Sequence, residues 1–301
     1  MNRTRLDTFE ALRPELTRHA YRMLGDCGEA EDAVQDTYLR WSDALQRTEV
    51  ENDRAFLRSV TTRLCLDRLR SARVRREAYV GPWLPEPVVS DPNENPEAAA
   101  ALADDVSFAL LLALERLSPL ERAAFLLHDG LDVPFEEVAS MLGRSEPSVR
   151  RLASRARDHL RETRPRARVS HEDAIRLRDA FAAALQKEDP AALAELLTED
   201  VVVTSDGGGK VSAATVPVAG RDRVGRMLLG LQRKGGASVK RVELAKINGL
   251  PGFVFFDERG VMQTLALELR DGRIAAMYVM RNPEKLVRVA ERYAAQPSGW
   301  S

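Results

Sequence analysis

The 301-residue sequence contains only two cysteines, four histidines and 6% aromatic residues, and it has no apolar run of membrane-spanning length. Cys27 and Cys65 lie within helical patterns and have no companions at metal-ligand spacing, so we expect buried thiols in a reducing cytosol and no metal site. The N-terminus lacks the apolar core of a signal peptide. These absences exclude a disulfide-stapled secreted protein, and we expect a cytoplasmic protein without membrane contact.

Lysine does not occur before Lys187, so every basic residue in the first half of the chain is an arginine or a histidine. The formal net charge is −1, which means that any affinity for nucleic acid must come from local patches. Arginines are concentrated in two stretches, residues 63–76 and 144–168. These stretches are therefore the candidate nucleic-acid contacts.

Residues 118–161 have the spacing of a helix-turn-helix. One apolar face precedes a turn at 143–145 and another follows it; together they comprise Phe135, Val138, Ala139, Leu142, Val149, Leu152, Ala153, Ala156 and Leu160. The outer face of the second helix has four arginines, Arg150, Arg151, Arg155 and Arg157. An arginine fork binds phosphate oxygens or a guanine edge bidentately, so this pattern favours DNA binding over a solvated basic helix in an ordinary bundle.

Residues 6–76 predict an all-helical block. The helix over 29–45 has a core stripe of Val34, Tyr38, Trp41 and Leu45. A second face combines acids, an amide and an apolar residue: Asp32, Gln35, Asp36 and Leu39. It is interpreted either as a partner site or as a solvated face. The next helix, 54–71, presents an arginine strip that suits a nucleic-acid backbone: Arg63, Arg70 and Arg73.

Residues 77–105 form an acidic segment with five prolines, which favours extended backbone over helix. Its WLPEP sequence, residues 83–87, places Trp83 and Leu84 on a stretch with no core of its own. We therefore expect this segment to dock on another part of the chain.

The phrases EDAVQDTYLRW and LSPLERAAFLLHDGLDVPFEEVASMLGRSEPSVRRLASRARDHLR resemble an extracytoplasmic-function sigma factor over residues 6–165. The resemblance implies sigma region 2 at 1–76 and sigma region 4 at 106–165, with core RNA polymerase (β′ clamp and β flap) and promoter DNA as partners. The face of Asp32, Gln35, Asp36 and Leu39 would bind the β′ clamp helices. The arginine strip and the loop 46–53 would open and read the minus-ten element. The helix 146–161 would read the minus-35 element, with DNA contacts from Ser145, Glu146, Ser148, Arg150, Arg151 and Arg155. The linker is longer and richer in proline than a minimal member of this family would have.

Residues 169–291 predict a third, α+β domain, followed by a tail at 292–301. Helices are expected at 172–185 and 190–197, and strands at 201–206, 210–218, 239–247, 252–257, 262–270 and 273–280, the last three as a meander. This order resembles the SnoaL-like, ketosteroid-isomerase-like cone fold. The predicted fold class is thus multidomain: two all-α sigma modules, the second with the helix-turn-helix, and a cone domain.

Three short motifs, WLPEP, DGGGK and NPEKL, resemble one subgroup of these sigma factors, in which the extension acts as a built-in regulator. DGGGK is no phosphate loop, because Thr204 and Val211 stand where such a loop needs Gly and Ser or Thr. It is either a plain glycine turn or a site of close backbone approach. We expect the motifs to meet at one junction that includes Trp83, Leu84, Pro85, Asp206, Gly207, Gly208, Gly209, Lys210, Asn282 and Pro283. The alternative is a third domain that swings freely on residues 163–170.

The sequence therefore predicts a sigma factor that directs RNA polymerase to promoters and has no catalytic residues and no cofactor of its own. The alternative is a DNA-binding protein whose cone domain is a small-molecule sensor or an isomerase-type or cyclase-type enzyme. Acid–base chemistry in the cone would need a carboxylate or histidine inside it, and Asp206 and Glu268 are the candidates. Whether a small molecule binds in the cone stays open.

Overall fold

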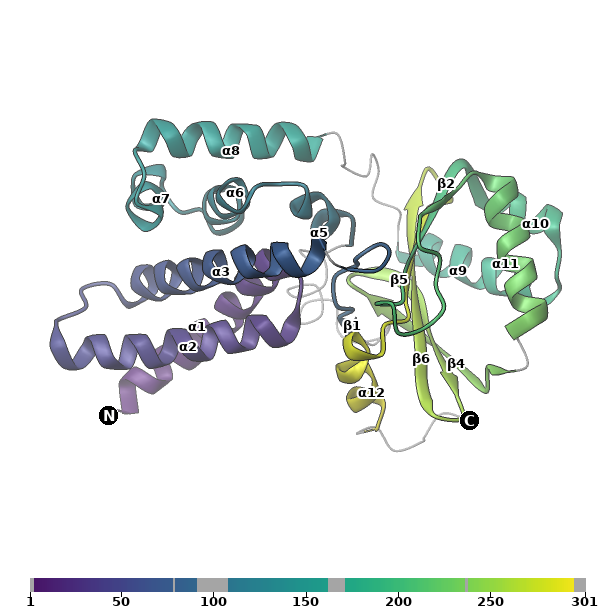
Figure 1. Cartoon of the computed structure of the whole chain (residues 1–301), viewed down its shortest axis with the longest axis horizontal. Coiled ribbons are helices and arrows are strands. Elements are labelled where there is room, and N and C mark those ends of the chain that lie inside the picture. Colours follow the sequence, from purple (N-terminus) through teal and green to yellow (C-terminus); the bar gives the residue numbers. More distant parts are fainter. Residues whose placement is uncertain (1–2, 78, 91–107, 162–170, 236–237, 295–301) are drawn as a thin grey trace. The chain divides into compact units, whose positions relative to one another are not determined.

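The computed structural model describes residues 3–77, 79–90, 108–161, 171–235 and 238–294 (Figure 1). Contacts divide the chain into two units, the first made of Met1–Ala78 and Leu110–Arg164, the second of Tyr79–Ala109 and Pro165–Ser301. The N-terminal part of the expected linker thus belongs with the C-terminal part of the chain. The expected hinge at 163–170 lies outside the described residues. No described helix is long and apolar enough to cross a membrane.

Unit one begins with three helices, α1 (Arg3–Leu24), α2 (Cys27–Arg47) and α3 (Asp53–Glu77). The carboxylate of Asp26 caps α2 by accepting from the amide of Glu29 at 2.8 Å. The buried residues of α2 recur at helical spacing: Ala30, Ala33, Val34, Thr37 and Trp41. The predicted core stripe is confirmed at Val34 and Trp41, whereas Tyr38 and Leu45 are half-buried.

The rest of unit one contains α5 (Phe108–Glu115), whose first two residues belong to unit two, and then α6 (Pro119–Leu131), α7 (Phe135–Leu142) and α8 (Glu146–Arg161). Ser118 and Glu121 form a capping box at the start of α6. Gly143 ends α7 in the left-handed region at φ 61°. α7, the turn and α8 confirm the predicted helix-turn-helix.

Unit two is a seven-stranded sheet in the order β1-β4-β5-β6-β7-β2-β3. Its strands are β1 (Val89–Ser90), β2 (Leu197–Asp206), β3 (Val218–Ala219), β4 (Arg241–Ile247), β5 (Leu250–Asp257), β6 (Gly260–Arg270) and β7 (Arg273–Met280). β4 to β7 form an antiparallel meander, which confirms the predicted order of strands, and β2 pairs in parallel with β7. β1 comes from the expected linker and pairs with β4, so the linker extends the sheet at its edge.

Different helices pack on the two faces of this sheet. Helices α9 (His171–Gln186), α10 (Pro190–Leu196) and α11 (Arg221–Gly235) cover one face (Figure 1). They pack on alternate residues of the strands, among them Val201, Val203, Phe253, Leu265, Leu267 and Met277. On the opposite face, Tyr293 of α12 (Val287–Ala294) meets the ring of Phe256 edge-on. This arrangement confirms the predicted cone-like α+β fold.

One expected strand of unit two is wrong, one helix was missed, and the last helix extends past the expected start of the tail. Residues 210–217 are not a strand, because the amides of Lys210 and Val211 both bond to the carbonyl of Gly207 and close a turn; only Val218–Ala219 pairs, as β3. The sequence reasoning missed α11 altogether. The helix α12 runs to Ala294 and so includes the first residues of the expected tail, while 295–301 lie outside the described residues.

Candidate functional site

The predicted polymerase-binding residues lie together on α2. Asp32 and Gln35 are exposed, and Leu39 exposes 55% of its surface, which is unusual for a leucine on a packed helix. Asp36 accepts a hydrogen bond of 2.7 Å from Arg68 of α3, whose other terminal nitrogen lies 3.9 Å from Asp32. Both acids therefore also hold α3, so a substitution at Asp36 changes an internal contact as well as the surface.

The arginine strip on α3 is only partly available. The Nε of Arg63 donates to the carbonyl of Met141 in α7 at 3.2 Å. Arg70 donates to Asp67, one turn earlier, at 3.0 Å, and this pair is exposed. Arg73 lies in α3, but its side chain is outside the described part of the chain. The structure thus places the three arginines on one helix, and the two whose side chains are described, Arg63 and Arg70, bond to different partners.

The predicted minus-35 contacts lie at the start of α8. The carbonyl of Ser145 accepts from the amides of Ser148 and Val149, which fixes the first turn. Arg150 is exposed and donates to Glu146 at 2.8 Å through Nε. Four of the six expected residues, Ser145, Glu146, Ser148 and Arg150, therefore form one locally ordered turn.

Aromatic stacking orders the same region further. The ring of Phe135 lies between the imidazole of His128, 3.6 Å away by ring centroids, and the guanidinium of Arg150, 4.5 Å from the Phe135 centroid. Arg151 and Arg155, the remaining expected contacts, are exposed farther along the same helix. Arg157, the fourth arginine of this face, donates to Asp129 of α6 at 2.7 Å through Nε, so the outer face of α8 has two arginines with defined partners and two, Arg151 and Arg155, that are exposed.

The three motifs of unit two meet around the buried carboxylate of Asp206, which has no exposed surface. Its Oδ1 accepts from the hydroxyl of Tyr79 at 2.6 Å and from the amide of Gly208 at 3.0 Å. Its Oδ2 accepts from the amide of Leu84 at 2.9 Å and from the ammonium of Lys285 at 2.7 Å. Burial and the hydrogen bond to Asp206 raise the pKa of Tyr79 well above its usual value, so the phenol stays a donor.

Lys285 connects the last motif to the linker. Its ammonium donates to the carbonyl of Leu84 at 2.6 Å and lies 4.2 Å from the ring centroid of Trp83 and 4.9 Å from that of Tyr79. Asn282, which lies in the same segment as Lys285, donates a hydrogen bond of 2.9 Å to the Tyr79 hydroxyl. The backbone of the linker is thus hydrogen-bonded to both members of the Asp206–Lys285 ion pair, and the linker's two aromatic rings contact the Lys285 ammonium.

The three glycines of DGGGK combine both of the expected roles. Gly208 and Gly209 have φ of 62° and 70°, as a glycine turn requires. A Cβ on Gly208 would lie 2.4 Å from the amide nitrogen of Asn282, and one on Gly209 would lie 3.1 Å from the side chain of Val80. A Cβ on Gly207 would lie 2.5 Å from the carbonyl of Val211. At Gly208 the turn therefore approaches the last motif more closely than a residue with a side chain permits, and at Gly209 it packs tightly against Val80 of the linker.

The remaining expected residues of this junction flank it. Lys210 pairs with Glu284 at the surface, and Pro283 is exposed beside it. Trp83 is half-buried, whereas Pro85 is buried. We call the segments 79–86, 206–210 and 282–286 the linker junction.

A second contact lies at the other end of the expected linker. The ring of Phe108, the first residue of α5, stacks on Tyr278 of β7 with centroids 5.1 Å apart, and the Tyr278 hydroxyl donates to Glu268. Phe108 itself is almost fully buried. Both sides of the stretch 91–107 are therefore attached to the sheet of unit two.

The two carboxylates proposed for acid–base chemistry do not lie on the helix-covered side of the sheet. Leu267 and Val203 belong to the core beneath the helices, and side chains alternate along a strand, so Glu268 and Asp206 point to the opposite face. Asp206 is also fully engaged by four donors. Among the described residues, no group of three or more His, Cys, Asp or Glu side chains could hold a metal ion.

Three residues of this site were absent from the sequence-based set: Tyr79, Lys285 and Phe108. Lys285 is part of NPEKL, and its position in a motif offered a signal. Tyr79 lies shortly before the Gly-Pro pair at the start of the docked segment, and an aromatic residue at that position offered a weaker signal. No local pattern links Phe108 to Tyr278, because that contact depends on strand register.

Comparisons with known proteins cover nearly the whole chain. Residues 8–75 match the family described as sigma-70 region 2, and residues 107–160 match sigma-70, region 4. The chain is 42% identical to the ECF RNA polymerase sigma factor SigJ of Mycobacterium tuberculosis over 97% of its own length and 96% of the relative. It is 33% identical to the probable ECF RNA polymerase sigma factor SigI of that species, covering 92% of this chain and 93% of the relative. The crystal structure of the M. tuberculosis extracytoplasmic function sigma factor SigJ matches with a TM-score of 0.75 and 39% identity, over 93% of this chain and 98% of that chain.

Proposed function

This chain belongs to the extracytoplasmic-function RNA polymerase sigma factors, and we propose that its C-terminal unit controls promoter use by holding the linker between the two sigma regions. As a sigma factor it directs core RNA polymerase to promoter DNA, and the polymerase performs the chemistry. The proposal concerns the part of the chain beyond residue 165 and the linker segments attached to it.

The observation that carries this proposal is the buried Asp206–Lys285 pair with the backbone of Leu84 bonded to both members. A buried ion pair costs desolvation energy, and we propose that this one is retained because it fixes one geometry. Here the geometry is that of residue 84, which follows sigma region 2 by a few residues. The stacking of Phe108 on Tyr278 supports the same idea on the other side, because sigma region 4 begins at residue 107.

The consequence is regulation by geometry. Leu84 and Phe108, on either side of residues 91–107, are both attached to one sheet, so unit two fixes the distance between these two points. A free linker of this length would let the two DNA-binding regions sample many spacings. A partner or ligand that favours the detached linker would shift the population of spacings and hence the promoters that can be used.

The roles of the individual sigma surfaces are part of the same proposal. The face of Asp32, Gln35, Asp36 and Leu39 binds the polymerase clamp, and its exposed leucine supports this role. The start of α8, with Arg150 held by Glu146 and Phe135, contacts the minus-35 element. The loop 46–53 with the arginine strip contacts the minus-ten element, where the Nε of Arg63 has to leave the Met141 carbonyl before this nitrogen can bind phosphate.

The test is promoter-dependent transcription by core polymerase and the purified full chain. Trp83→Ala removes the ring beside the Lys285 ammonium, and Gly208→Val places a side chain against Asn282 at a left-handed backbone position. We expect both variants to change transcript yield while their circular dichroism stays that of the wild type. Lys210→Gln, which removes only a surface ion pair at the same junction, is the matched control and should behave as wild type. Unchanged transcription by both junction variants would refute the proposal.

A further inference from the structure

We infer that Glu15 of α1 is a positioning residue for the loop between α2 and α3, acting through the first two turns of α3. This inference rests on the proposed role of the loop 46–53 at the minus-ten element. It adds a residue outside the loop, on a different helix, that nothing in the sequence pattern singles out.

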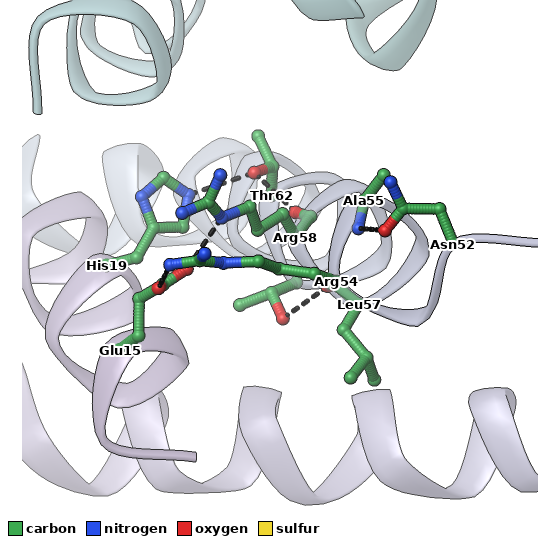
Figure 2. A network of polar contacts seen from close by, with 9 residues as sticks. Glu15, His19, Asn52, Arg54, Ala55, Leu57, Arg58 and Thr62 are labelled. Atoms are coloured by element: carbon green, nitrogen blue, oxygen red, sulfur yellow. Dashed lines mark hydrogen bonds and ion pairs between the residues drawn. The ribbon is translucent and has the colours of Figure 1, made fainter. Parts of the chain in front are cut away.

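Both carboxylate oxygens of Glu15 accept hydrogen bonds from arginines of α3 (Figure 2). Its Oε1 accepts from the Nε of Arg58 at 2.6 Å, and its Oε2 accepts from a terminal nitrogen of Arg54. The Glu15 side chain is only 15% exposed. Burial raises the pKa of Glu15, but hydrogen bonds and charges from Arg58 and Arg54 outweigh burial and hold the pKa below its usual value. The carboxylate is therefore ionised and holds both arginines at neutral pH.

The loop between Arg47 and Asp53 is short, and its C-terminal end is fixed at several points. The indole nitrogen of Trp41 donates to Asp53 at 2.9 Å, and Asn52 accepts from the amide of Ala55 at 3.0 Å. Trp41 and Asn52 both lie in the α2–loop–α3 segment itself. Glu15 alone among these anchors comes from α1, so it ties the end of the loop to the rest of the helical group.

The exposed parts of this arrangement indicate positioning rather than stability. The Arg54 side chain is 57% exposed, whereas Arg58 is only 13% exposed, so the pair with Arg54 adds little to folding and the contact with Arg58 belongs to the packing of α1 on α3. The neighbouring core is held independently, for example by the buried hydrogen bond of 2.9 Å between His19 and Thr62 (Figure 2). Glu15→Gln keeps an amide oxygen that accepts from Arg58, so this variant should leave the fold intact while it loosens the first turn of α3, which sets the direction of the loop.

The experiment uses the full chain bound to core polymerase and compares Glu15→Gln with Glu10→Gln. Glu10 lies on the same helix, is exposed, and pairs only loosely with Arg13 at 3.4 Å, so it is the matched control. Three affinities are measured: for core polymerase, for a double-stranded minus-35 fragment and for a single-stranded minus-ten oligonucleotide. We expect Glu15→Gln to weaken only the last, by roughly tenfold, the size associated with one charge-assisted hydrogen bond. Glu10→Gln should change none of the three.

Two further variants decide how the effect arises. If the effect passes through Arg54, the double variant Glu15→Gln with Arg54→Gln should bind the oligonucleotide no worse than Arg54→Gln alone. Leu69→Val, a core change elsewhere on α3, supplies a comparison with lowered stability. An equal loss in Leu69→Val at a matched unfolding temperature would mean that stability explains the effect, and the inference would be overturned.

Failure of the inference is distinguishable from failure of the proposed loop function. Glu49→Ala and Glu51→Ala change exposed residues of the loop itself. If they weaken oligonucleotide binding while Glu15→Gln does not, the loop contacts the minus-ten element and Glu15 does not position it. If neither loop variant changes binding, the loop does not contact this element and the inference loses its premise.

Discussion

Replacing Lys285 with methionine should release the linker from unit two. Methionine matches the length of the lysine side chain and suits the space between the rings of Trp83 and Tyr79. The substitution removes the ammonium and leaves the Asp206 carboxylate fully buried, with three uncharged donors and no counter-charge. The carbonyl of Leu84 also loses its donor.

The size of the effect follows from these losses. Removing one partner of a buried ion pair costs about 3–5 kcal/mol, because the remaining charge stays buried without compensation. Each factor of ten in an equilibrium corresponds to about 1.4 kcal/mol. Opening of the 79–90 segment should therefore become about 10²- to 4 × 10³-fold more favourable in Lys285→Met.

Hydrogen exchange measures that opening directly. In the wild type, the amides of Leu84 and Val88 donate to Asp206 and Asn248, so both should exchange slowly. In Lys285→Met they should exchange faster by the factor given above, while peptides from β5 and β6 keep their wild-type rates. The unchanged strands would show that the domain itself stays folded.

Two comparisons sharpen this result. Lys210→Gln breaks the exposed pair with Glu284 and should change exchange by less than about fivefold, because surface pairs contribute about 0–1 kcal/mol. Adding Asp206→Asn to Lys285→Met should restore part of the protection, since the amide leaves no unpaired charge. If Leu84 keeps its wild-type protection in Lys285→Met, the ion pair does not hold the linker and the reasoning is refuted.

Three further predictions concern the sigma regions. Leu39→Asp should abolish most binding to core polymerase without changing the helical spectrum, because it puts a charge into an apolar contact; an affinity titration with core polymerase checks it. Arg151→Ala and Arg155→Ala should weaken minus-35 footprints, by about 1–3 kcal/mol at one base position for a base contact, or equally for all sequences for a phosphate contact; wild-type footprints from both would contradict the placement of α8. Burial raises the pKa of Glu121, but hydrogen bonds from Ser118 outweigh it and hold the pKa below its usual value. The Glu121 carboxylate therefore stabilises the fold above the unfolded pKa near 4.5, and this stabilisation is lost as pH falls through the folded pKa. Hydrogen exchange in the first turn of α6 should accelerate over that pH range. Glu121→Gln should remove this pH dependence.

Periodicity and turn chemistry were enough to predict the helices of unit one. The pattern of Val138, Ala139, Val149 and Ala153 around Gly143 predicts two helices and their packing faces, because a helix shows its burial at a fixed spacing. The strands 252–257 and 273–280 were predicted nearly at their observed bounds, since turns at Gly260 and Gly272 separate alternating segments.

Errors arose where local pattern and tertiary contact compete. Residues 210–218 have the pattern of a strand. However, the carbonyl of Gly207 accepts hydrogen bonds from two of their amides, and Pro217 has no amide hydrogen to donate. The helix α11 was missed although Val224, Met227, Leu228 and Leu231 have helical spacing, which was a usable signal. The hydrogen-bond partners of individual arginines could not be predicted from the sequence, because no local rule pairs Arg63 with Met141 or Arg68 with Asp36.

The most direct measurement of the central claim is a transcription profile against promoter spacing. Each base pair added between the two promoter elements moves them about 3.4 Å apart and rotates them by about 35°. A chain whose linker is attached to unit two at Leu84 and Phe108 should have a narrow optimum of spacing, and Lys285→Met should broaden or shift that optimum. Identical profiles for the wild type and Lys285→Met, with faster exchange at Leu84 verified in the same preparation, would contradict the claim that the C-terminal unit sets the spacing of the sigma regions.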